Sequence, residues 1–155
     1  MSEDFKVTGA QDFYKLSKSL KAAGRTELRK ELTKGMQRAA KPLIADTREA
    51  ARRDLPHRGG LANLVAKAPQ RVQVRTGAST YGVRIVVGAG RSGARATSLF
   101  GYVRHPTFGH RDRWVRQSVT PGWFDRTLDN AAPRVRPDIE AALEAVAETI
   151  VRGAK

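Results

Sequence analysis

Residues 102–123 read YVRHPTFGHRDRWVRQSVTPGW, and this segment holds both tryptophans of the chain, two of its three histidines and four arginines. It is too polar for an ordinary core strand, yet its large aromatic side chains would gain free energy by burial, so it is not typical of a disordered tail. Two prolines and two glycines interrupt it: Pro106, Gly109, Pro121 and Gly122. These residues predict a strand, a long loop, a second short extended piece and a turn. We therefore expect an ordered arm over residues 102–124 that contacts a partner outside this chain.

The length and charge of the chain limit what it can be. Its 155 residues fit one domain, which we place over residues 1–155. The 29 basic and 15 acidic side chains leave a net charge of +14, which favours nucleic acid, an acidic protein surface or a membrane surface as a partner. Residues 51–130 hold 14 basic and four acidic residues, so most of the excess positive charge lies there. The chain has no cysteine, which excludes disulfides and thiolate metal sites.

Upstream of the arm, residues 11–55 show the apolar spacing of three and four that is typical of amphipathic helices. Gly24 interrupts this region, which predicts a short helix before it and a longer helix after it. Pro42 lies inside the longer helix, where it lacks an N–H donor and its ring clashes with the preceding turn. We therefore predict one bent helix, with its kink near Ala40 and Lys41.

Residues 70–119 form the expected β region. Apolar residues recur with a period of two over 72–75 and 83–87, which is typical of strands, and we expect these two strands to pair antiparallel. The further elements predicted here are an exposed loop at 88–98, a third strand at 99–104 and a fourth strand at 114–119.

The last part of the chain is again helical by pattern. Residues 123–131 predict one or two helical turns, and residues 134–152 predict a C-terminal amphipathic helix with Pro137 in its first turn, where proline is tolerated. The predicted fold class is therefore α+β: a kinked long N-terminal helix and a C-terminal helix packed on a small antiparallel β-sheet, with a long loop and an extended arm.

Three patterns could carry chemistry, and each is weak. Residues 88–93 match GxGxxG, but the segment that follows is too short for the crossover helix of a dinucleotide site. His105, His110 and Asp112 have the spacing of no common metal motif, and four nearby arginines would repel a cation. Ser118 has no nucleophile-elbow sequence around it. We therefore expect no catalytic residues, no cofactor, no metal and no enzymatic activity.

Arginines interleaved with aromatic residues indicate a binding surface. Such residues neutralise phosphates and stack on bases in nucleic-acid-binding proteins, and they are also enriched at protein interfaces. The sequence contains no helix-turn-helix, zinc-finger or single-strand-binding signature that would decide between these two uses. We predict a subunit interface formed by eleven residues of the arm: Tyr102, Arg104, His105, Phe108, His110, Arg111, Arg113, Trp114, Arg116, Trp123 and Phe124.

The order of these elements, together with several short motifs, resembles that of a known family. The motifs are a Pro…Gly-Leu turn at 56–61, Val-Val-Gly at 86–88, an aromatic-Val strand at 102–103, His-Pro-x-Phe-Gly at 105–109 and Pro-Gly-Trp-Phe at 121–124. From about residue 13 to residue 151 the chain is similar to the small neck and tail-component proteins of long-tailed bacteriophages, which complete the tail or join it to the head. Many relatives carry an acidic residue followed by Phe-Gly-Thr where this chain has Arg104 and His105.

This resemblance implies a structural virion protein, assembled in the host cytoplasm, that forms a homo-oligomeric ring, commonly of six subunits, at the head-tail junction. The implied partners are head-completion or connector proteins and tail-tube or tail-terminator proteins, and no membrane is implied. Arg84, Arg91 and Arg95 would face either acidic surfaces of these proteins or the DNA in the channel. We favour the protein surfaces, because a passage for sliding DNA should not hold it tightly. The alternative function is that of a basic, sequence-neutral DNA-binding accessory protein.

Overall fold

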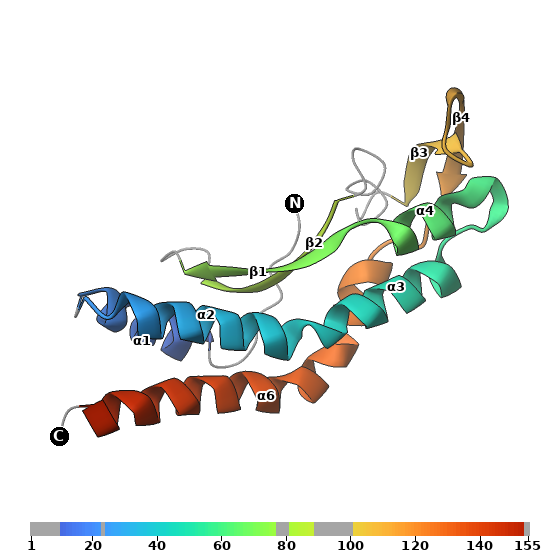
Figure 1. Cartoon of the computed structure of the whole chain (residues 1–155). Coiled ribbons are helices and arrows are strands. Elements are labelled where there is room, and N and C mark those ends of the chain that lie inside the picture. Colours follow the sequence, from blue (N-terminus) through green and yellow to red (C-terminus); the bar gives the residue numbers. More distant parts are fainter. Residues whose placement is uncertain (1–9, 23, 77–80, 89–100, 154–155) are drawn as a thin grey trace. The chain divides into compact units, whose positions relative to one another are not determined.

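The computed structural model describes residues 10–22, 24–76, 81–88 and 101–153 (Figure 1). The chain divides into two compact units, one formed by residues 1–3, 43–71 and 85–131 and the other by residues 4–42, 72–84 and 132–155. Helices and antiparallel strands are both present, so the fold is α+β, as the sequence predicts.

The second unit begins with two helices joined by a glycine turn. α1 (Ala10–Ala22) ends where Gly24 adopts a φ of +68°, and the N–H of Arg25 donates to the carbonyl of Leu20 at 2.9 Å. This bonding pattern closes the helix end and requires a left-handed residue, which glycine adopts without strain. α2 (Thr26–Ala40) then packs against α1, and its Leu32 side chain is buried.

Pro42 produces the predicted kink. α2 ends at Ala40 and α3 (Pro42–Asp54) begins two residues later, while Lys41 keeps helical backbone angles. The N–H of Lys41 donates to the carbonyl of Arg38 at 3.3 Å, three residues back instead of four. The long N-terminal helix is therefore bent at 40–41, as a proline inside a helix requires.

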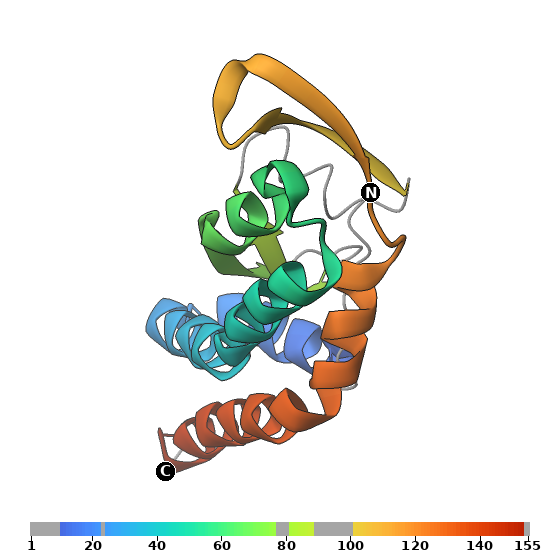
Figure 2. The ribbon, with the colours of Figure 1, turned by 90° about the vertical axis from the view of Figure 1, so that its right-hand side faces the viewer.

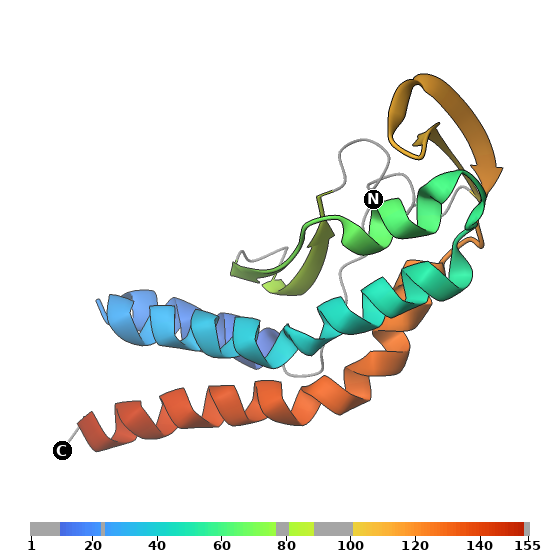
Figure 3. The same cartoon turned by 45° about the vertical axis from the view of Figure 1, so that its right-hand side comes forward.

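The first unit continues from α3 into a tight reversal. A short 3₁₀ turn, η1 (Arg58–Gly60), contains two consecutive left-handed glycines, Gly59 and Gly60, and leads directly into α4 (Leu61–Lys67). Figure 3 shows α4 lying alongside α3 after this reversal. Small and branched apolar side chains of the two helices are buried: Leu43, Ala50, Ala51, Leu61, Ala62, Val65 and Ala66.

The strands form two separate two-stranded sheets in the described part of the chain, where the sequence predicted one sheet. β1 (Gln70–Thr76) pairs with β2 (Tyr81–Val87), and β3 (Tyr102–Thr107) pairs antiparallel with β4 (His110–Ser118). A period of two identifies a strand but not its neighbour, because pairing depends on which faces become buried. Beyond Gly88, the predicted 88–98 loop lies outside the described residues.

The predicted long loop inside the arm is wrong. The register pairs Thr107 with His110, so only Phe108 and Gly109 connect β3 to β4. Their φ angles of 48° and 83° are those of a two-residue hairpin turn in which both central residues are left-handed. The strands consequently lie at 102–107 and 110–118, where the sequence predicted 99–104 and 114–119.

The C-terminal helix is longer than predicted. α6 (Trp123–Gly153) is one element of 31 residues, where the sequence predicted a short helical piece and a separate helix at 134–152. Pro133 and Pro137 both lie inside it and both are exposed, so Pro137 is not in a first turn. A buried stripe on the opposite side continues past both prolines at Leu128, Ala132, Val135 and Ile139. Burial of this stripe outweighs the backbone hydrogen bonds that the prolines remove.

Candidate functional site

The β3–β4 hairpin has one buried face and one exposed face. In an antiparallel pair, residues directly opposite one another point to the same side of the sheet. The pairs Val103–Gln117 and His105–Val115 point inward, and Val103 and His105 are 1% and 0% exposed. Three other pairs define the outer face of the hairpin: Tyr102 with Ser118, Arg104 with Arg116, and Pro106 with Trp114.

Polar contacts fix the inward face to η1. His105 Nε2 lies 2.8 Å from Gln117 Oε1, and Gln117 Nε2 donates a short hydrogen bond to the carbonyl of Arg58. At the turn, the N–H of Phe108 donates to the carbonyl of Gly59 at 2.9 Å. Figure 2 shows the hairpin, in yellow and orange, seated over the turn that leads into α4. The hairpin is thus an anchored extension of the first unit.

The outer face brings two arginines together without a compensating acid. Arg104 and Arg116 are opposite one another in register and both are exposed. Within the described residues neither one forms an ion pair. The Arg116 guanidinium carbon lies 3.9 Å from the centroid of the Tyr102 ring, a cation–π contact that limits the motion of that guanidinium. Its remaining N–H groups are free to bind a carboxylate or phosphate.

An irregularity in the sheet presents Trp114. Pro106 pairs with Trp114 but the next residue, Thr107, pairs with His110, so β4 contains an unpaired insertion at residues 111–113. The indole N–H of Trp114 donates to the carbonyl of Arg111 at 2.7 Å, which fixes the ring while leaving it 48% exposed. Phe108, at the hairpin turn, is 72% exposed.

Eight of the eleven predicted interface residues lie exposed on this hairpin, and the other three do not. The exposed residues are Tyr102, Arg104, Phe108, His110, Arg111, Arg113, Trp114 and Arg116. His105, Trp123 and Phe124 are buried, with Trp123 only 2% exposed, so their side chains do not belong to an exposed interface. The rings of Trp123 and Phe124 meet edge to face at 5.6 Å, and this contact belongs to the core.

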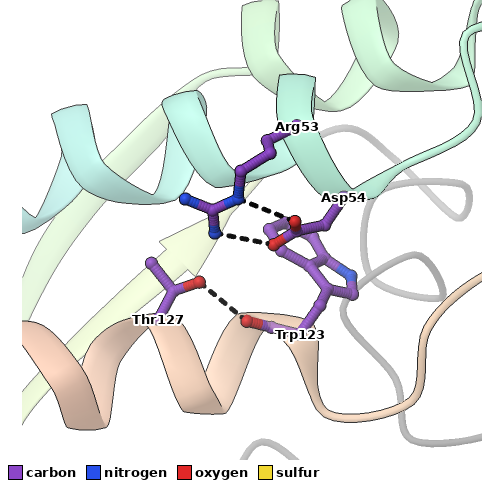
Figure 4. Close-up of polar contacts among 4 residues, drawn as sticks. All are labelled: Arg53, Asp54, Trp123 and Thr127. Carbon is purple, nitrogen blue, oxygen red and sulfur yellow. Dashed lines mark hydrogen bonds and ion pairs between the residues drawn. The ribbon is translucent and has the colours of Figure 1, made fainter.

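The end of α3 and the start of α6 hold the clearest polar cluster that sequence reasoning missed (Figure 4). Arg53 Nε and Nη2 donate to the two carboxylate oxygens of Asp54 at 2.8 and 2.9 Å, beside the Trp123 ring, and Thr127 Oγ1 donates to the Trp123 carbonyl at 2.7 Å. The hydrogen bonds from Arg53 lower the pKa of Asp54 and raise the pKa of Arg53 itself. Both partners are partly or fully accessible to water, so this cluster is a surface ion pair near the core.

The other predicted binding residues lie elsewhere. Arg84 is half-buried on β2, and Arg91 and Arg95 lie outside the described residues. Over the residues that the structure describes, no three His, Cys, Asp or Glu side chains are grouped so that they could hold a metal ion. No helix in the same part of the chain combines the length and apolarity that a bilayer crossing needs.

The chain was compared with protein-family models, curated proteins and solved structures, and no match was found in any of the three.

Proposed function

We propose that this chain is a structural assembly subunit that binds other folded proteins through the outer face of its β3–β4 hairpin. Specifically, it would be a neck or tail-completion protein of a long-tailed bacteriophage, forming a ring at the head-tail junction and residing in the virion. The observation that carries the proposal is the outer face itself, where an exposed tryptophan, an exposed tyrosine and two unpaired arginines stand on an anchored hairpin. The phage assignment is supported by the sequence resemblance described above.

The composition and rigidity of the outer face favour a protein partner. Trp, Tyr and Arg are the residues that contribute most of the binding free energy at protein interfaces. The Tyr102 ring is already covered by Arg116, and the Trp114 ring is held by a hydrogen bond, so little conformational freedom remains to be lost on binding. A nucleic-acid base would have to displace Arg116 before it could stack on that side of Tyr102.

A ring also requires a second, different surface on the same chain, because its contacts are head to tail. α6 supplies one: Glu140, Glu144 and Glu148 recur at a spacing of four, and all three are exposed. Residues four apart lie on one side of a helix, so these carboxylates form an acidic stripe. We propose that the basic hairpin of one copy contacts the acidic stripe of the next.

Charge reversal tests this contact. The unmodified chain should associate at high concentration in sedimentation velocity, and Arg104→Glu combined with Arg116→Glu should leave a folded monomer. Lys18→Glu with Lys41→Glu is the matched control, because it makes the same change in net charge at exposed sites of the second unit. Equal association of the hairpin and control variants would refute the proposal, and so would a chain that stays monomeric without any mutation.

A complementary exchange tests the partner surface. Chains carrying Glu140→Lys and Glu144→Lys should also stay monomeric on their own. When they are mixed with the Arg104→Glu, Arg116→Glu chain, mixed complexes should form, because each variant restores the opposite charge to the other. Failure to recover mixed complexes would show that these two surfaces do not meet.

A basic, sequence-neutral DNA-binding protein is the second candidate, and the unpaired cross-strand guanidinium groups beside Trp114 favour it. The measurement is fluorescence anisotropy with labelled oligothymidine at low and high salt. DNA binding would replace assembly as the function if a stable monomer binds the oligonucleotide tightly. This binding should be lost in the Arg104→Glu, Arg116→Glu variant and should weaken about tenfold or more when salt is added.

A further inference from the structure

A shallow groove of about 480 Å³ lies between α4 and the turn of the hairpin. We call it the tip groove, and its lining is mostly apolar or glycine: Gly60, Asn63, Leu64, Lys67, Ala68, Pro69, Phe108 and Gly109. The tip groove is separate from the outer face of the hairpin, because it is not lined by any of Tyr102, Arg104, Trp114 and Arg116. All of its lining residues belong to the first unit.

The wall formed by Phe108 is held in place by the backbone. Phe108 has a φ of 48°, which non-glycine residues seldom adopt, and its N–H is bonded to Gly59. Gly60 has no side chain, and a Cβ there would lie 2.9 Å from Phe108 Cδ1. The phenyl ring therefore stands against bare backbone on one side and remains 72% exposed to a partner on the other.

A second hollow, of about 450 Å³, is also lined by Phe108. Its lining includes Arg58 and Arg116, together with Thr107, Val115 and Gln117. Phe108 is thus common to both hollows. The charged residue in the tip groove is Lys67, and those in the second hollow are Arg58 and Arg116. Arg58 begins η1, before α4, and Lys67 lies in the last turn of α4, so cations precede and follow the apolar residues of that helix. Among the described residues, neither hollow is lined by an acid.

We propose that the tip groove binds an extended acidic segment of another protein, in which one large apolar side chain is flanked on both sides by aspartate or glutamate. The apolar side chain would pack on Phe108 and Leu64, and the flanking carboxylates would reach Lys67 on one side and Arg58 on the other. Charge complementarity favours an acidic partner, since the charged residues that line the two hollows are Lys67, Arg58 and Arg116. Leu64, Ala68 and Pro69 in the lining favour an apolar side chain over a nucleic acid.

The test uses the full chain labelled with ¹⁵N and a capped nonapeptide with one central phenylalanine and four glutamates on each side. Titration should produce saturable chemical-shift changes at the amides of Gly60, Leu64 and Gly109. Replacing the peptide's phenylalanine by alanine, or its glutamates by lysines, should weaken binding about tenfold or more. Equal binding of the lysine peptide, or shift changes confined to the outer face, would overturn the proposal.

Variants of the protein separate binding from folding. Phe108→Ala and Lys67→Glu alter exposed side chains and should each weaken the peptide about tenfold while the spectrum of the free chain stays dispersed. Lys41→Glu, also exposed but outside the groove, should bind as the unmodified chain does. If oligothymidine displaces the peptide from the groove amides, nucleic acid is the occupant. If these amides shift when the free chain is diluted, a second copy is the occupant. Either result would overturn the proposal. The peptide result is independent of ring assembly, so either proposal can fail without the other.

Discussion

Replacing Gly60 by alanine should destabilise the first unit through the hairpin turn. Gly60 has a φ of +83°, and an added Cβ would lie 2.9 Å from Phe108 Cδ1 and 3.4 Å from Phe108 Cα. The ring atom belongs to an exposed side chain that can rotate away, but the Cα belongs to the hairpin backbone. Gly109 is the matched control, because it has the same φ of +83° and nothing lies within 4 Å of its added Cβ.

The two substitutions therefore share the same backbone strain, but only Gly60→Ala also crowds a neighbouring side chain. Placing an L-residue in the left-handed region costs about 1–2 kcal/mol in either case. Crowding of Phe108 adds about 1 kcal/mol for Gly60→Ala alone, the lower end of the range for overpacked sites, because the ring can move. We expect a loss in the free energy of unfolding of about 2–3 kcal/mol for Gly60→Ala and of about 1–2 kcal/mol for Gly109→Ala. In a chain of this size, the difference corresponds to a Tm gap of about 2–4 °C.

Thermal unfolding followed by circular dichroism, together with urea titration, measures both values. Adding Phe108→Ala should remove most of the extra loss in Gly60→Ala, since the clashing ring is then absent, and should change Gly109→Ala much less. If Gly60→Ala and Gly109→Ala unfold at the same temperature, the hairpin turn does not rest on η1 as described. If Phe108→Ala changes the stability of Gly60→Ala and of Gly109→Ala equally, the Phe108 ring is not what destabilises Gly60→Ala.

Four further predictions follow from single contacts. Gln117→Ala should lower the free energy of unfolding by about 1–3 kcal/mol in urea titration, because a buried imidazole and a backbone carbonyl each lose a hydrogen-bond partner. Trp123→Ala should lower it by about 3–5 kcal/mol by opening a cavity in the core. Arg53 lowers the pKa of Asp54 in the folded state. The stability that the Asp54 carboxylate contributes is therefore complete above its usual pKa of about 3.9 and is lost as the pH falls through the lowered pKa. Asp54→Asn should remove this contribution to the decrease of Tm at acid pH. Arg104→Gln should raise the free energy of unfolding by about 0.2–1 kcal/mol, since it removes repulsion from Arg116, while weakening association in sedimentation.

The sequence predicted features that depend on local chemistry and missed those that depend on burial. Pro42 kinks its helix as expected, because its missing donor and ring clash act within one turn. Pro133 and Pro137 have the same chemistry, yet α6 continues through them because a buried stripe holds the helix on its other side. The two-residue turn was missed because Phe108-Gly109 lacks the Asn-Gly or Asp-Gly pair that usually marks such a hairpin.

Composition alone could not separate the two tryptophans, but position within an element could have done so. Trp114 pairs with Pro106 on the outer side of the hairpin, whereas Trp123 is the first residue of a helix whose buried stripe continues through Leu128. Extending that helical stripe backwards from residue 128 reaches Phe124 and would have predicted burial there. The inward position of His105 depends on pairing with β4, and a single strand does not reveal its partner.

The pairing of Arg104 with Arg116 is the feature that folding alone does not explain. Like charges directly opposite one another in a sheet are unfavourable, and the described residues supply neither arginine with an acid. The buried side of the same hairpin is, by contrast, fixed by polar contacts: His105 Nε2 lies 2.8 Å from Gln117 Oε1, and Gln117 Nε2 donates to the carbonyl of Arg58. A hairpin that is held on its inner side and has two adjacent, unpaired arginines on its outer side fits the binding surface proposed above. This contrast between the two faces supports a role in which the second half of each outer-face contact is supplied by another protein.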